Sequence, residues 1–229
     1  MITMCCSKDF SPVYPSYFGI SSVPMSKYIK LCATKDVIDA SDKDTDFVYC
    51  NNFEDKDAQI FADALENAKY LKELSLARNM FGSEAGEILG PAISGNDILE
   101  VLDLSWNHIR GKGAIAVAKG IGENVRLKSC NISWNGFGPE GGAAVGEAMV
   151  ANNALFELDV SGNRLTADSA MKMARMISCN DNIRVLKIGN NILTTAGAIA
   201  IATSINNSDS NELEELDITR THLGCIRSG

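Results

Sequence analysis

A frame of leucines and asparagines that returns every 28 residues constrains this chain more than any other feature of its sequence. The first clear copy is Leu71–Asn79, which reads LKELSLARN. Later copies begin at Leu99, Leu127, Leu155 and Ile183. A last copy begins 30 residues further on at Leu213, with Thr221 in place of the asparagine, and a degenerate copy with Val48 and Asn51 precedes the first. A fixed period of this length predicts structural repeats that stack on one another.

Each copy begins with a segment that we expect to form a short strand. In the first copy Leu74 and Leu76 alternate with other residues, which predicts that both side chains point into the core. Asn79 lies where the chain leaves the strand, and we expect its amide to hydrogen-bond backbone groups of neighbouring repeats. Cys130 replaces leucine in one copy and fits the core there as a small apolar side chain.

The second half of each repeat has the spacing of a helix. Ala58, Phe61 and Leu65 begin three columns, and this spacing predicts one buried helical face. The first column is small in every copy, so we expect the helix backbone to approach the sheet closely. An apolar column that begins with Phe53 and Phe81 is expected to anchor the loop between strand and helix. Just past the helices, where a left-handed C-terminal cap is expected, the chain repeats an asparagine at Asn96, Asn124, Asn152 and Asn180.

Strand, loop and helix together predict an α/β solenoid, a right-handed horseshoe arc with parallel strands on its concave face and helices on its convex face. We expect these repeats to span residues 43–229, after a largely flexible extension at 1–42 that contains a short helix beginning near Ser26. The sequence stops at Gly229, before the last repeat reaches a helix. We therefore expect either a truncated product or isoform, or a C-terminal edge that pairs with something else.

The repeat resembles the ribonuclease-inhibitor class of leucine-rich repeats, over roughly residues 43 to 229. The segments that carry the resemblance are Leu102–Ile109 (LDLSWNHI), Ile132–Gly138 (ISWNGFG) and Leu158–Leu165 (LDVSGNRL). The resemblance implies an intracellular protein and brings no catalytic residues with it.

Charge and cysteine content exclude several classes of function. Acidic residues outnumber basic ones by 29 to 21, which disfavours nonspecific binding to nucleic acid or to acidic membranes. The N-terminal residues do not resemble a secretory signal, and no apolar stretch approaches the roughly 20 residues that span a bilayer. Seven scattered cysteines, an odd number, favour reduced thiols over a disulfide framework. We therefore expect a cytoplasmic protein, with the nucleus as an open alternative.

The strand residues between the buried ones face the inside of the arc, and we expect them to bind a protein partner. Trp106 and Trp134 are the two tryptophans of the chain and hold equivalent positions in adjacent repeats. Parallel strands lie about 4.8 Å apart, so the rings are close enough to stack. With Asp103 and Asp159 beside them, they predict a hot spot for a partner with a basic rim. The remaining residues of the predicted site are Asn131, Glu157, Lys187 and Arg78.

A second interpretation of the tryptophan pair remains open, in which both rings fold over the loop and cover the core. The predicted function is a scaffold or adaptor without catalysis, cofactor or metal. One alternative is a regulator of a small GTPase that presents Arg78 or Asn79 to the nucleotide, and another is a fragment of a sensor protein. Gly136–Gly141 fits the glycine pattern of dinucleotide sites, but the repeat itself accounts for it. His108 and His222 share a column but lie four strands apart, too far to share a metal.

Overall fold

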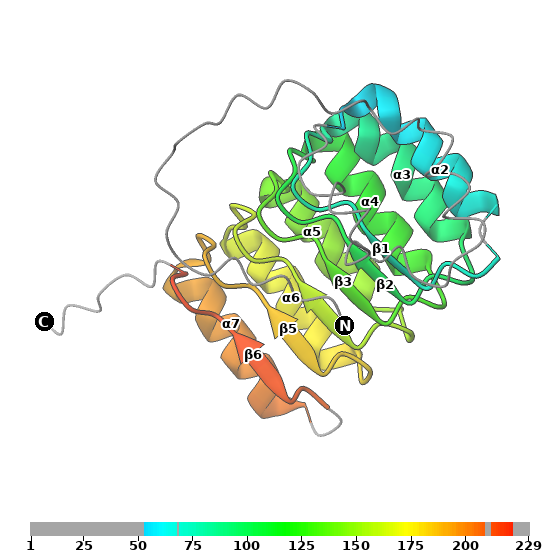
Figure 1. Cartoon of the computed structure of the whole chain (residues 1–229). Coiled ribbons are helices and arrows are strands. Elements are labelled where there is room, and N and C mark those ends of the chain that lie inside the picture. Colours follow the sequence, from blue (N-terminus) through cyan, green and yellow to red (C-terminus); the bar gives the residue numbers. More distant parts are fainter. Residues whose placement is uncertain (1–52, 68, 209–211, 222–229) are drawn as a thin grey trace, which may run out of the picture.

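The computed structural model describes residues 53–67, 69–208 and 212–221. They form one curved layer of parallel strands with a layer of helices along its outer side (Figure 1). The expected extension at 1–42, the degenerate copy with Val48 and Asn51, and His222 lie outside the described residues. The predicted α/β solenoid, with strands inside the arc and helices outside, is confirmed.

The six strands in the described part of the chain follow one another in chain order. They are β1 (Glu73–Ser75), β2 (Val101–Asp103), β3 (Ser129–Asn131), β4 (Glu157–Asp159), β5 (Val185–Lys187) and β6 (Glu215–Asp217). Glu73 pairs with Val101 and every later pair up to β5 keeps that 28-residue offset, while Val185 pairs with Glu215. Because the order β1 to β6 never reverses, this sheet lacks the switch point at which open α/β sheets bind dinucleotides.

The helices repeat with the same period on the convex side. They are the short 3-10 turn η1 (Asp55–Asp57) and the helices α2 (Ala58–Asn67), α3 (Ser83–Gly95), α4 (Gly111–Glu123), α5 (Gly138–Met149), α6 (Ala167–Cys179) and α7 (Thr194–Asn207). The predicted helical face is buried, as Val117 and Ile121 of α4 illustrate, and so is the loop column that begins with Phe53 and Phe81. Among the described helices, none combines the length and apolar content that crossing a bilayer requires.

The small residues of the helices allow contact with the next helix as well as with the sheet side. A Cβ atom placed on Gly86 of α3 would lie 2.7 Å from the backbone of Gly113 in α4, closer than real Cβ atoms approach. On α5, a Cβ atom on Gly142 would meet the side chains of Leu165 and Ser169. The expectation that these positions serve the sheet was therefore incomplete, because at Gly86 and Gly142 a residue of the next helix also leaves no room for a larger side chain.

The asparagines at the strand exits form a buried ladder, as predicted. Asn107 Nδ2 donates to the carbonyl of Leu104 in its own repeat and to that of Leu76 in the preceding repeat, both at 3.0 Å. Its Oδ1 accepts the N–H of Phe81 at 3.1 Å. In the last described repeat the Thr221 hydroxyl takes over part of this role by donating to the carbonyl of Ile218. The ladder satisfies backbone groups that a three-residue strand leaves unpaired.

The asparagines that follow the helices form a second ladder, and the prediction of a left-handed cap there was wrong. Asn96, Asn124 and Asn180 have φ values of −84°, −70° and −106°, which is extended backbone. Asn124 Nδ2 instead reaches the last carbonyls of the preceding helix, at Ile93 (2.6 Å), and the carbonyl of Asn96 (2.7 Å). Each asparagine therefore caps the helix of the repeat before its own, which requires no left-handed residue.

Candidate functional site

The first residue beyond each strand turn has left-handed backbone, and this geometry directs its side chain. The φ values are 58° at Arg78, 56° at Trp106, 54° at Trp134, 65° at Gly162, 54° at Asn190 and 53° at Arg220. After several strands the turn is held by the side chain at the end of the strand: Asp103 Oδ1 accepts the N–H of Ser105 at 2.8 Å. Asn131 and Asp159 accept the equivalent bonds from Ser133 and Ser161. Because each repeat whose strand the structure describes shares this conformation, it belongs to the fold and is not strain particular to a site.

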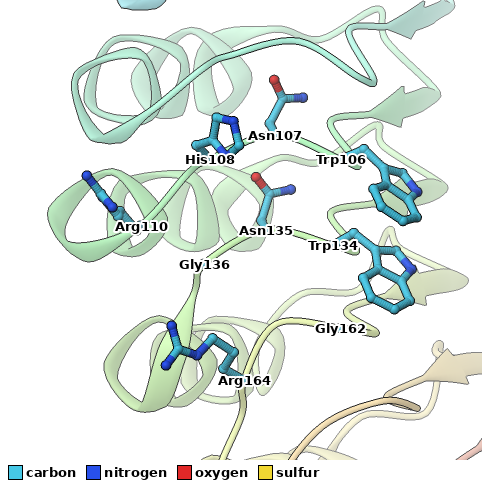
Figure 2. Close-up of a pocket in the computed structure, with 9 residues that line it drawn as sticks. All are labelled: Trp106, Asn107, His108, Arg110, Trp134, Asn135, Gly136, Gly162 and Arg164. Carbon is cyan, nitrogen blue, oxygen red and sulfur yellow. The ribbon is translucent and has the colours of Figure 1, made fainter. Parts of the chain in front are cut away.

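The two tryptophans stack on each other on the open side of this turn. Their ring centroids are 4.7 Å apart and the ring planes are 12° from parallel, and Figure 2 shows the rings side by side. The stack continues at both ends. The Arg78 guanidinium lies 5.6 Å from the Trp106 ring centroid, and a Cβ atom on Gly162 would lie 2.7 Å from Cδ2 of Trp134. Four consecutive repeats thus contribute one layer each.

The stack leaves much of both rings in contact with solvent. Trp106 is 48% exposed and Trp134 is 41% exposed, although stacking already covers one face of each ring. The expectation that the rings are close enough to stack is confirmed. Since Arg78 and Gly162 cover the outer ring faces, the exposed parts are the edges that point away from the core. A partner would meet an aromatic ridge that is already ordered.

A pocket of about 380 Å³ begins at this ridge and runs over the strand-to-helix loops. Figure 2 shows the tryptophans on one side of it and Arg110 and Arg164 on the other, next to the helices. Asn107 and Asn135 also line it, but their amides belong to the buried ladder and are already hydrogen-bonded. The remaining polar side chains in its lining are those of His108, Arg110 and Arg164.

Gly136 makes room for this pocket. His108, Gly136 and Arg164 hold the same position in three successive repeats, so the glycine leaves a gap between two basic side chains. The backbone of Gly136 pairs with Arg110 in an isolated parallel bridge, and its N–H donates to the carbonyl of Ile109 at 2.9 Å. The floor of the pocket is therefore formed by paired backbone.

The predicted site residues divide into three groups. Arg78, Trp106 and Trp134 share the stack. Asp103, Asn131 and Asp159 hold the strand turns, and burial, with a contribution from the nearby Asp159 charge, raises the pKa of the Asp103 carboxyl.

Glu157 and Lys187 form an ion pair on the inner face, with 3.1 Å between Lys187 Nζ and Glu157 Oε1. Glu157 also accepts a hydrogen bond from Ser129 Oγ at 3.2 Å. These inner-face charges are therefore partly engaged within the sheet. Whether any predicted site residue binds a partner stays a prediction.

Sequence reasoning missed the basic side of the pocket. His108 was considered only as a metal ligand, while Arg110 and Arg164 were not singled out. His108, Gly136 and Arg164 share one column of the repeat, and a glycine between two basic residues in such a column predicts a gap between their side chains. Arg110 belongs to a different column, and only the loop geometry brings it to the same pocket. Within the described part of the chain, no group of three or more His, Cys, Asp or Glu residues is placed to hold a metal ion.

Comparison with known proteins adds the following. A family model described as Leucine Rich repeat matches residues 95–118, 124–146 and 151–174. A search of curated protein sequences finds no significant match. Among solved structures, leiomodin-1 actin-binding site 2 is similar with a TM-score of 0.56 and 17% identity, covering 64% of this chain and 86% of that one. The tropomodulin C-terminal domain of Caenorhabditis elegans is similar with a TM-score of 0.53 and 18% identity, covering 66% of this chain and 93% of that one. At these identities the likeness concerns the fold.

Proposed function

We propose that this leucine-rich-repeat solenoid is a protein-interaction scaffold that binds a protein partner on the inner side of its arc and performs no catalysis. The observation that carries the proposal is the ordered, half-exposed stack of Trp106 and Trp134. Tryptophan is enriched among the residues that dominate binding energy at interfaces. Because the stack is ordered before binding, less conformational entropy is lost when a partner covers it.

The similar solved structures support the use of this fold for protein binding. One of them is named as an actin-binding site of leiomodin-1. That name describes leiomodin-1, and at 17% identity it does not identify the partner of this chain. It supports the general proposal that a solenoid of this kind presents a protein-binding surface.

Two finer points belong to the same proposal. The segments Leu102–Ile109, Ile132–Gly138 and Leu158–Leu165 resemble leucine-rich repeat-containing protein 74, and the resemblance implies an intracellular protein without catalytic residues. We infer a cytoplasmic or nuclear location on this basis.

The GTPase-regulator alternative receives less support from the geometry. Asn79 is buried, and its amide donates to the carbonyls of Leu76 and Ala77. It is therefore not presented to a nucleotide, and Arg78 lies over the Trp106 ring. The sensor-fragment alternative has no particular feature of the described residues in its favour. The scaffold is the function that the exposed aromatic stack supports best.

The test replaces both tryptophans and compares partner capture. Trp106→Asn with Trp134→Asn suits the left-handed backbone, because Asn190 holds the same position naturally. The control variant, Tyr70→Ala with Phe156→Ala, removes two other exposed aromatic side chains. Circular dichroism checks that both variants keep the fold.

In capture experiments from cell extract, we expect the tryptophan variant to lose its specific partners and the control to retain them. Loss of even one hot-spot residue, at about 2 kcal/mol or more, corresponds to a fall in affinity of roughly 30-fold or more. If the tryptophan variant retains the same partners in the same amounts, the proposal fails.

A further inference from the structure

We propose that the pocket beside the tryptophan stack binds an acidic peptide segment, whose carboxylates pair with Arg110 and Arg164 while an apolar side chain packs against the exposed ring edges. The inference rests on the proposed function, since it names the chemistry of the partner. It also departs from the sequence-based expectation of a partner with a basic rim.

The charge of the pocket is opposite to that of the chain. The whole chain carries a formal charge of −8, yet the residues that line the pocket include two arginines and a histidine and no carboxylate. Asp103 and Asp159, which prompted the earlier expectation, end their strands and are engaged in the turns. A ligand that reaches the pocket therefore meets positive charge.

The two guanidinium groups are available for a ligand. Many exposed basic side chains of this protein are paired, such as Arg184 with Glu214 at 2.8 Å and Lys172 with Glu147 at 2.7 Å. Across the described ranges, neither Arg110 nor Arg164 has a carboxylate partner within 4.0 Å. Each guanidinium can therefore donate two parallel hydrogen bonds to a carboxylate, a geometry that lysine does not offer.

The helices add to the positive potential at this edge. The residues before α4, α5 and α6 are Arg110, Phe137 and Thr166, and none of them caps its helix with a side-chain hydrogen bond. The positive ends of the three helix dipoles thus lie on the same side as the arginines, which favours an anion. Glu140 and Asp168, in the first turns of α5 and α6, form no ion pair with either arginine.

The spacing favours a peptide over a single small anion. Arg110 and Arg164 belong to repeats that are two apart and to different columns of the repeat, so their backbones are separated by at least about 10 Å at the usual strand spacing. Figure 2 shows their side chains on either side of Gly136. An extended peptide rises about 3.3 Å per residue, so carboxylates three or more residues apart can span this separation. The aromatic ridge alongside provides an apolar contact that inorganic phosphate would not use.

The test selects ligands without assuming their sequence. A random peptide library is displayed and selected on the immobilised full-length chain, and the selected peptides are titrated in solution. Trp106 and Trp134 are the two tryptophans of the chain, so with tryptophan-free peptides the tryptophan fluorescence, excited selectively over tyrosine, reports on this stack alone. We expect enrichment of Asp and Glu, and a fluorescence change on binding that weakens as salt is added.

The decisive variant is Arg110→Gln with Arg164→Asn, in which asparagine suits the left-handed backbone of Arg164 (φ 59°). The matched control, Lys119→Gln with Arg175→Gln, removes two positive charges from exposed positions on α4 and α6. We expect the first variant to bind the selected acidic peptides roughly 10-fold to 100-fold more weakly, because two charge-assisted contacts are lost. The control should retain the original affinity.

The outcomes separate this inference from the proposed function. If the selected peptides are basic or neutral, if none is enriched, or if the arginine variant binds acidic peptides as well as the control does, the acidic-peptide inference is wrong. In each of these cases the proposed function still holds if the tryptophan variant loses its protein partners. If the arginine variant loses affinity for the acidic peptides but the tryptophan variant captures the same partners as the original chain, the proposed function is wrong and the acidic-peptide inference is supported.

Discussion

Replacing Asn152 by alanine tests the second asparagine ladder, and the exposed asparagine that follows it directly in the chain, Asn153, provides a matched control. Asn152 is buried, whereas Asn153 is exposed and makes no side-chain hydrogen bond within the described residues. The Asn152 amide donates to carbonyls of Ile121, Gly122 and Asn124, at 3.2, 3.0 and 2.9 Å, and accepts from the N–H groups of Ala154 and Leu155, at 3.1 and 2.9 Å. The variants Asn152→Ala and Asn153→Ala therefore differ in this network.

The expected loss follows from these bonds. The amide has two N–H groups, so it supplies two donor bonds, and its oxygen accepts two more. At about 1 kcal/mol net for each bond, Asn152→Ala should lower the free energy of unfolding by about 4 kcal/mol, or about 3 kcal/mol if a water molecule fills the space. Asn153→Ala should change it by less than about 0.5 kcal/mol, as is usual at exposed positions.

Urea unfolding followed by circular dichroism measures the difference in free energy. Hydrogen exchange adds a local measurement, because Ala154 and Leu155 lose the acceptor for their N–H groups and should exchange faster in the Asn152 variant only. If the free energies of unfolding of the two variants differ by less than about 1 kcal/mol, the hydrogen bonds of the ladder do not stabilise the solenoid by the expected amount.

Two other predictions concern titratable groups. Asp103→Asn should raise the free energy of unfolding at neutral pH, because burial raises the pKa of the Asp103 carboxyl and so penalises its ionised form in the folded state. Asn131 already makes the same turn in the next repeat. This increase in the free energy of unfolding should disappear as pH falls below the pKa of the carboxyl in the unfolded chain. An increase that urea titrations show to be the same at every pH would contradict this prediction. A thiol reagent should modify exposed Cys179 in the native protein and Cys130 only after unfolding, because Cys130 is buried and burial raises the pKa of its thiol. Peptide mapping distinguishes the two cysteines. Equal labelling of both cysteines in the native protein would show that the core opens.

The register of the sheet was predictable because a repeat has to place equivalent residues at equivalent points in space. The pairing of Glu73 with Val101 follows directly from the 28-residue spacing. The contact of Trp106 with Trp134 follows from the same spacing, since both rings leave their strands at the same turn. These features depend on the period alone.

Features that depend on contacts between repeats were harder to predict. Asn124 has the position of a helix cap, and the pattern of one helix does not reveal that its partner is Ile93 in the helix before. The pocket was not predicted for a related reason. Arg110 is not in the column of His108 and Arg164, and only the course of the loop places it in the same pocket. Sequence periodicity describes equivalent positions well, but it says little about which unequal positions meet.

The pairing of β5 with β6 shows where this architecture tolerates variation in length. Thirty residues separate Val185 from Glu215, two more than in the preceding pairs, yet the strands remain aligned. The additional residues are taken up outside the strands, on the connection that includes α7. Insertions on the convex side can therefore accumulate without moving the inner rows of side chains. An evolving solenoid of this kind can vary its outer surface freely while the spacing of its inner display stays constant.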